Sequence, residues 1–195
     1  MEAAASLAWQ AQSILPDSVT DALAWKKKML FSFSRFDLKE MHLERIGSGG
    51  PLILKFDRLD DSWTAAKDGK DETLNINPNR ANRYLDELEK MEVSTWLPYT
   101  DATAHEALKN PVFRLKLILQ VYKEAAPVQS QAGPSDITFA PEPETEEKVI
   151  TLEIAPAGEA GYSRFYYGRV NTSPNYFILN MDAVRLLGAS LSEDN

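Results

Sequence analysis

Cysteine is absent from this sequence of 195 residues, and histidine occurs only twice. Without cysteine the chain cannot form a disulfide bond, use a thiolate as a nucleophile or bind a metal ion through sulfur. The two histidines, His42 and His105, belong to no Ser-His-Asp or HExxH pattern, so we expect surface or interface roles for both. The sequence therefore predicts no catalytic residue, no metal site and no cofactor.

An excess of positive charge is also missing. The chain has 21 Lys and Arg against 29 Asp and Glu, which gives a net charge of −8, and its isoelectric point is about 4.9. Nucleic acids and anionic membrane surfaces select for clustered basic residues, so we expect no nucleic-acid partner.

Long apolar runs are missing as well. A helix needs about 20 apolar residues to span a bilayer, and no run approaches this length. The start, MEAAASLAWQAQ, lacks the basic region followed by an apolar region that is typical of a signal peptide. Two interpretations stay open: a cytosolic protein, or a fragment of a longer protein that meets the membrane only through a segment absent from this chain.

The composition is that of a soluble globular protein, with 44% apolar and 26% charged residues. The clearest helix is predicted over NPNRANRYLDELEKMEV, because Asn77 suits the N-cap, Pro78 suits the first helical position and apolar residues recur at helical spacing. Further helices are predicted over residues 18–29, where the basic run 26–28 forms the last turn, over residues 102–109, and from Asn180 or Asp182 to about Gly188.

Alternation of apolar and polar residues predicts strands. It is most regular in VFRLKLILQVY, which indicates a long antiparallel strand with one face exposed to water. Six strands are expected, over residues 41–45, 52–57, 113–121, 150–154, 162–170 and 175–179. The predicted fold class is therefore α+β, a meander of about six antiparallel strands packed on one face by helices.

Glycines and aspartates near the first strands indicate turns. GSGGP joins two of the predicted strands as a hairpin, and no Gly-Lys-Ser/Thr follows it as in a phosphate-binding loop. Asp60 and Asp61 follow the second strand, at a position where aspartate favours turns through bonds to the backbone. Because DDSWTAAKDGKDE lacks the ligand spacing of a calcium loop, we interpret the pair as turn residues and expect Trp63 to return to the core.

The chain is predicted to have one domain. Residues 1–17 are interpreted as an N-terminal extension, and residues 18–195 as a single α+β domain. Within it, residues 123–148 carry four prolines, six acidic residues and almost no periodicity. Such a segment cannot bury enough apolar surface to offset the entropy of ordering, so it is predicted to be a flexible insertion.

One stretch, YSRFYYGRV, indicates a recognition surface. Aromatic residues and arginine are enriched in binding hot spots. Strand alternation places Tyr162, Arg164 and Tyr166 on one face, and Tyr167 and Arg169 on the other. We predict that one of these two groups forms a solvent-facing aromatic binding patch. Cross-strand aromatic pairing within the sheet is the alternative.

Four segments together resemble a known family. WKKKMLFSFSRFDLKEMHLER is similar to its opening, ILKFDRLDDSW to its second strand and following turn, NRANRYLDELEKMEV to its leucine-bearing helix, and ALKNPVFRLKLIL to a helix end, a proline and a long strand. The family is domain of unknown function 4340 (DUF4340), and the resemblance spans about residues 25–190. It implies a place in bacterial envelope proteins associated with ABC-type transport and gliding systems, and it brings no catalytic residues.

This resemblance and the lack of a catalytic pattern favour a non-enzymatic binding or scaffold module. The expected location is periplasmic or extracytoplasmic, with the full-length protein anchored in the membrane. The expected partner is a protein or glycan of the cell envelope, with ABC-transporter-associated components among the candidates. Two alternatives stay open: a hydrolase-type enzyme whose carboxylates converge only in three dimensions, and a cytosolic adaptor that binds through its acidic loop.

Overall fold

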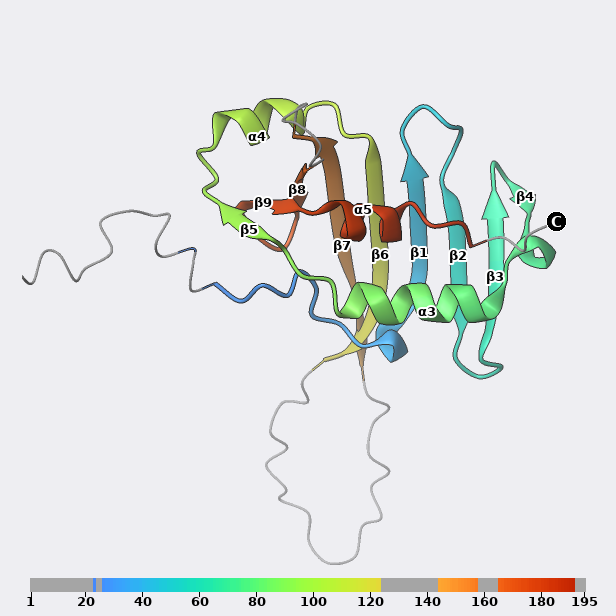
Figure 1. The fold of residues 1–195 in the computed structure, drawn as a ribbon. Helices are drawn as coiled ribbons and strands as arrows, with labels where there is room; N and C mark the ends of the chain where they lie inside the picture. Colours follow the sequence, from blue (N-terminus) through green and yellow to red (C-terminus); the bar gives the residue numbers. More distant parts are fainter. Residues whose placement is uncertain (1–22, 24–25, 124–143, 158–164, 192–195) are drawn as a thin grey trace, which may run out of the picture.

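Nine antiparallel strands in one sheet organise the part of the chain that the computed structural model describes, namely residue 23 and residues 26–123, 144–157 and 165–191 (Figure 1). The first four strands form one meander: β1 (Leu38–Arg45), β2 (Leu52–Asp57), β3 (Ser62–Lys67) and β4 (Lys70–Asp71). A second meander consists of β6 (Phe113–Tyr122), β7 (Thr145–Pro156), β8 (Tyr166–Val170) and β9 (Tyr176–Leu179).

The two meanders meet where β1 pairs with β6, and the strand order is β4-β3-β2-β1-β6-β7-β8-β9-β5. The connection between them contains α3 (Pro78–Glu89), β5 (Thr95–Leu97) and α4 (Ala102–Ala107), and β5 joins the sheet at the outer side of β9. The last helix, α5 (Met181–Leu187), follows β9. Both edges of the sheet are therefore strands of two or three residues, which limits the unpaired backbone that they present.

Side chains alternate between the two faces of the sheet along each strand, and the apolar ones form the core on one side. Along β6, Leu115, Leu117 and Leu119 are fully buried, whereas the alternate residues Arg114, Lys116 and Ile118 stay partly exposed. The buried residues of β6 are in register with those of β1 and β7, so a leucine such as Leu117 is flanked by Met41 and Ile150. This continuous apolar layer is the main core of the described residues.

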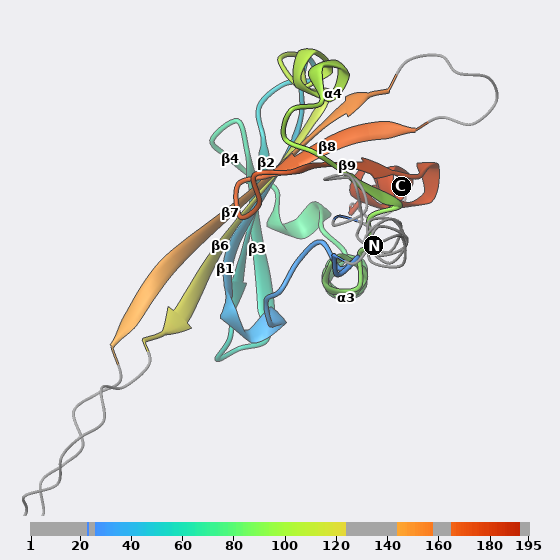
Figure 2. The same ribbon diagram turned by 90° about the vertical axis from the view of Figure 1, so that its left-hand side faces the viewer.

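Two helices cover the core side, which we call the covered face (Figure 2). Helix α3 begins as predicted, because the Asn77 side chain accepts a hydrogen bond from the Arg80 amide and Pro78 opens the first turn. Its apolar stripe is buried, and the Tyr84 hydroxyl donates to the Leu187 carbonyl at the end of α5 (3.3 Å). Burial raises the pKa of this hydroxyl far above its ordinary value. The two helices are thus bonded to each other above the sheet.

The opposite side of the sheet, which we call the open face, carries no described helix over β1, β2, β3, β6 and β7 (Figure 2). Among the helices that the structure describes, only α4 packs on this side, near the β8 and β9 end. There Ala104 and Leu108 form a small second core with Ala155 and Tyr176. The predicted antiparallel sheet with few helices is confirmed, but its helices cover only part of each face.

The prediction of about six strands is wrong, because the sheet that the described residues form has nine. β3, β4 and β5 were not predicted from the sequence. β3 reads SWTAAK, in which small residues conceal the alternation. β4 and β5 have two and three residues, which is too short for any period to be visible. The other strands lie near their predicted positions, except that residues 162–165 of the fifth predicted strand precede β8 or lie outside the described part of the chain.

Two other predicted boundaries need correction. Residues 26–29 are not helical: Lys26 lies in a bend, and Met29 forms a β-bridge with Glu92. The Lys26 ammonium instead lies 3.7 Å from the centre of the Trp96 ring, and burial lowers its pKa. The predicted insertion is too long at its C-terminal end, since residues 145–148 belong to β7 and pair with β6. Residues 124–143 lie outside the described part of the chain, and so does the predicted boundary between residues 17 and 18.

The aspartates after β2 are turn residues, as predicted. The Asp57 carboxylate accepts hydrogen bonds from the amides of Leu59 (2.8 Å) and Asp60 (3.4 Å), and Asp61 has a φ of 48°. These bonds close a four-residue connection, after which Trp63 returns to the core and lies 5.0 Å from the Phe56 ring. The predicted β1–β2 hairpin is confirmed as well.

Candidate functional site

The predicted aromatic patch falls on β8 and the residues before it. Tyr162 and Arg164 lie outside the described residues. Tyr166 packs against the main core on the covered face, whereas Tyr167 packs against the small core beneath α4. Arg169 lies on the same side as Tyr167 and is exposed. Tyr166 and Tyr167 thus lie on opposite sides of the strand, as alternation predicts, and the role of either group in binding stays a prediction.

Geometry assigns Arg169 to a different cluster, which we call the charged row: Glu44, Arg114, Glu153 and Arg169. These residues are register partners on β1, β6, β7 and β8, so their side chains follow one line across the open face. Arg114 donates to Glu44 (3.0 Å) and, through Nε and Nη2, to Glu153 (2.9 and 2.8 Å). Arg169 Nε donates to the other oxygen of Glu153 (2.5 Å). The row joins four strands on the side of the sheet opposite α3 and α5.

Glu153 is the centre of the charged row. Its side chain is only 13% exposed. Burial alone would raise the pKa of Glu153, but the hydrogen bonds and charges of Arg114 and Arg169 outweigh burial and lower it. The same contact with Glu153 raises the pKa of Arg114. Both groups therefore stay charged at neutral pH, and the row is a fixed ionic structure.

A second group of charges lies beside the row on the same face. Glu40 accepts a hydrogen bond from His42 (3.0 Å) and pairs with Lys55 (3.2 Å), and these contacts lower the pKa of Glu40, with the His42 bond as the largest cause. Lys39 pairs with Glu147, whose hydrogen bond raises the pKa of Lys39. His42 is thus a partly exposed surface residue, as predicted.

Lys116 lies between these two groups without an ion pair to any described residue. It is in register with His42 on β1 and with Thr151 on β7. The neighbouring apolar residues on this face, Ile53 and Ile118, are only partly exposed. Of the described charged residues on the open face, Lys116 is therefore a cation without an ion pair, next to charges that already have partners.

His105, the other histidine, belongs to α4. Its Nδ1 is 2.8 Å from the Tyr176 hydroxyl, and the two rings meet edge to face. This contact helps to seat α4 on the sheet, which agrees with the predicted interface role. Among the residues that the structure describes, no group of three His, Asp or Glu could hold a metal ion.

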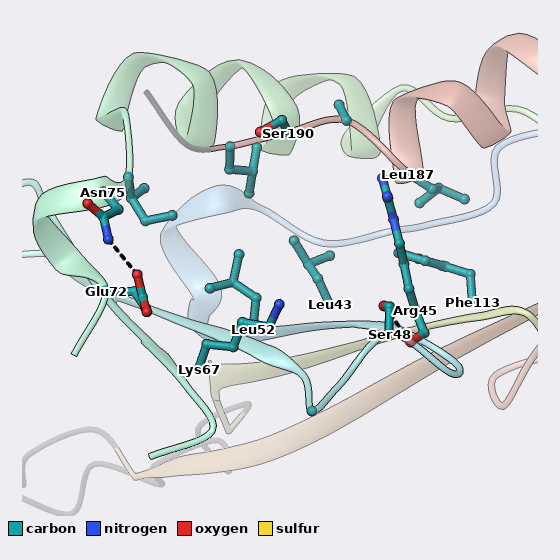
Figure 3. Close-up of a pocket in the computed structure, with 14 residues that line it drawn as sticks. Leu43, Arg45, Ser48, Leu52, Lys67, Glu72, Asn75, Phe113, Leu187 and Ser190 are labelled. Carbon is teal, nitrogen blue, oxygen red and sulfur yellow. Dashed lines mark hydrogen bonds between the residues drawn. The ribbon is translucent and has the colours of Figure 1, made fainter. Parts of the chain in front are cut away.

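A cavity of about 530 Å³ opens on the covered face (Figure 3). It lies between the ends of β1, β2 and β3, the 3₁₀ turn η2 (Thr73–Asn75) and the residues that follow α5. We call it the α5 cavity. Its apolar lining is Leu43, Leu52, Ile76, Phe113, Leu187 and Leu191, and its polar lining includes Arg45, Ser48, Lys67, Glu72, Asn75 and Ser190.

Polar groups ring this cavity in a partly fixed arrangement. Arg45 donates through Nη2 to the Gly188 carbonyl, which holds its side chain across one side of the opening. Glu72 accepts a hydrogen bond from the Asn75 side chain (2.5 Å) on the other side. Lys67 makes no ion pair with a described residue, and Figure 3 shows its side chain along the strand side of the cavity.

Sequence reasoning missed both the charged row and the α5 cavity. The row needs the register of four strands, and β1 and β6 are neighbours only because the chain crosses over between them. The cavity is lined by residues of β1, β2, β3, η2 and β6, and by residues 187–191 at and after the end of α5. The sole available signal was the regular placement of charged residues at the outward positions of the long strand VFRLKLILQVY.

Comparisons with known proteins give one match. A family model described as domain of unknown function (DUF4340) matches residues 2–111, which include β1 to β5, α3 and α4. No curated protein and no solved structure matches the chain. No helix of the described residues is both long and apolar enough to cross a membrane. Since the family model covers more than half of the 195 residues, the predicted resemblance is confirmed, and the chain belongs to the DUF4340 family.

Proposed function

We propose that the chain is a non-enzymatic binding module of a bacterial cell-envelope protein, and that the open face binds a protein partner. The observation that supports this proposal is the charged row, a set of ion-paired side chains on the face opposite α3 and α5, where α4 is the only described helix that packs. Side chains held by mutual bonds lose little conformational freedom when a partner docks. The envelope location rests on the kind of protein that the family resemblance implies.

The charge of the open face supports a protein partner. Among the charged residues described above, five basic ones (Lys39, Lys55, Arg114, Lys116 and Arg169) meet four acidic ones (Glu40, Glu44, Glu147 and Glu153) there, whereas the whole chain has a net charge of −8. A nearly neutral surface with partly exposed isoleucines has the mixed character of protein interfaces. Lys116 has no ion pair with a described residue, so we expect a carboxylate of the partner to pair with it at the centre of the proposed interface.

The carboxylates of this face are poorly suited to acid catalysis. A general acid at neutral pH needs a raised pKa. Here the pKa of Glu40 is lowered chiefly by its bond to His42, and that of Glu153 is lowered by its two arginine partners despite burial. This favours the binding module over the enzyme as the function of the open face.

Site-specific photocrosslinking in the full-length protein, expressed in its own bacterium, tests the proposal. A photoreactive residue at Thr151, next to Lys116, should capture one defined partner protein, whereas the same residue at Lys90 on the exposed end of α3 should not. Lys116→Glu should reduce the Thr151 adduct at least tenfold, and Lys90→Glu should leave it unchanged. Equal adducts at both positions, or an adduct indifferent to Lys116→Glu, would contradict a specific interface on the open face.

The proposed location has its own test. Protease added to intact cells with a permeabilised outer layer should cleave the domain in the full-length protein, while a cytosolic control protein stays intact. Protection of the domain until the inner membrane is lysed would favour the cytosolic adaptor instead.

A further inference from the structure

We propose that the α5 cavity binds a small monoanionic carboxylate with an aliphatic chain. This inference does not rest on the proposed function, because the cavity lies on the covered face, behind the sheet from the charged row. Its volume of about 530 Å³ is within the range of small-molecule sites, roughly 300 to 1,000 Å³.

The apolar part of the ligand is inferred from two leucines. On the covered face, Met41 and Leu54 are fully buried beneath the helices, but Leu43 and Leu52, two positions further toward the cavity, stay half-exposed. Leu43 and Leu52 are register partners on β1 and β2, so they present one continuous apolar floor. Covering this floor would remove apolar surface from water, which favours an aliphatic group.

The anionic part is inferred from the rim. Lys67 extends from the end of β3, and Arg45 crosses the opposite side with one of its nitrogen atoms bonded to the Gly188 carbonyl. The guanidinium has room there because residue 188 is glycine: a Cβ on it would lie 3.2 Å from Arg45 Nη2. Two cations therefore flank the apolar floor from opposite sides.

Charge balance selects a monoanion. Among the described residues, Glu72 is the only acidic side chain that lines the cavity, and it is bonded to Asn75 on the rim. Two cations and one carboxylate leave a single net positive charge. A carboxylate matches this charge, whereas a phosphate monoester at neutral pH would bring nearly two negative charges beside Glu72.

Amide chemical-shift titration of the purified chain with decanoate, kept below its micelle concentration, tests the site. Saturable shifts should cluster at Leu52, Lys67 and Gly188. Lys67→Gln should weaken binding about tenfold, the loss expected for a charged hydrogen bond. Glu72→Gln should tighten binding, because it removes the repelling charge. Lys70→Gln, at an exposed position on β4 outside the cavity, is the matched control and should change nothing.

Two further ligands separate the parts of the proposal. Decanol, which lacks the anion, should bind at least tenfold more weakly than decanoate. Tighter binding of decyl phosphate than of decanoate would overturn the assignment of a carboxylate. The site itself would be refuted by the absence of saturable shifts with decanoate, or by affinities that Lys67→Gln and Glu72→Gln leave unchanged in variants with intact thermal unfolding.

Discussion

The two faces of the sheet are built from the same strands but held by different forces. On the covered face, leucines such as Leu115 and Leu117 are fully buried under helices and against one another. On the open face, the alternate residues Arg114 and Lys116 remain partly exposed, and the contacts among neighbours are ionic. Burial stabilises a fold far more than exposed ion pairs do. The covered face thus contributes most of the stability of the fold, and the open face contributes less.

The largest difference between the faces should be seen in the free energy of unfolding when two adjacent residues of β6 are replaced by alanine. Leu117→Ala should lower the free energy of unfolding by about 2–5 kcal/mol, because it leaves a cavity in the core. Ile118→Ala, one residue along on the open face, should cost about 1 kcal/mol or less, since the partly exposed site refills with water. Urea denaturation of both variants measures the contrast. Equal losses would mean that the open face is also a packed core.

A second test adds volume to the covered face. Gly168 on β8 lies against the buried ring of Phe177 on β9, and a Cβ there would be 2.1 Å from the ring. Gly168→Ala should therefore cost about 1–3 kcal/mol through overpacking. The double variant Gly168→Ala/Phe177→Leu should lose less than the two single losses combined, because the smaller side chain makes room. If the stability losses of the two single variants simply add in the double variant, as measured by thermal unfolding, the contact between residues 168 and 177 is not the cause of the loss in Gly168→Ala.

A third test removes the centre of the charged row and has a smaller expected effect. Glu153→Gln should cost about 1 kcal/mol at neutral pH, because its arginine partners are 39% and 44% exposed and solvent screens the pairs. The folded-state pKa of Glu153 is lowered from its ordinary value of 4.5, so its contribution is fully present above pH 4.5 and is lost as the pH falls through the lowered value.

Urea unfolding as a function of pH therefore checks this third test. The difference between the original chain and Glu153→Gln should be constant above pH 5 and should shrink below about pH 4.5. Lys55→Gln, on the same face but outside the row, is the control, since it leaves the contacts of Glu153 intact. A difference that grows on acidification would contradict the direction of the Glu153 pKa.

The smallest expected effect is at Lys116. Because it has no ion pair with a described residue and stays partly exposed, Lys116→Ala should change the free energy of unfolding by no more than about 0.5 kcal/mol. A calorimetric melting curve should overlay that of the original chain. A loss above about 1 kcal/mol would assign Lys116 a structural role and remove it as the recognition cation of the open face.

The elements with strong local signals were predictable from the sequence. Asn77 and Pro78 predicted the start of α3 correctly. The regular alternation of VFRLKLILQVY predicted β6 and the side of it that is buried. Where local signals are weak, prediction was wrong or missing: β4 has two residues, and the segment 26–29 is extended although its charges suit a helix end. Tertiary contacts decide such segments, here the bridge of Met29 to Glu92 and the packing of Lys26 on Trp96.

The candidate sites were less predictable than the fold. Arg169 was singled out for its neighbours Tyr166 and Tyr167, but its strongest contact is with Glu153 on the adjacent strand. That contact depends on the pairing of β7 with β8, which alternation within one strand does not reveal. The α5 cavity depends on where the chain after α5 settles against the sheet, which is a property of the whole fold.

The pairing of β1 with β6 also has a consequence for the order in which the chain folds. Leu43 on β1 pairs with Leu115 on β6. Leu115 is synthesised later, after β2, β3, β4, α3, β5 and α4. Until then β1, eight residues long, has an unpaired edge, unlike the short strands that end the finished sheet. Such edges promote association between chains. A chain terminated at residue 111, where the family match ends, would keep that edge permanently, so newly made copies depend on the arrival of β6 to cover it.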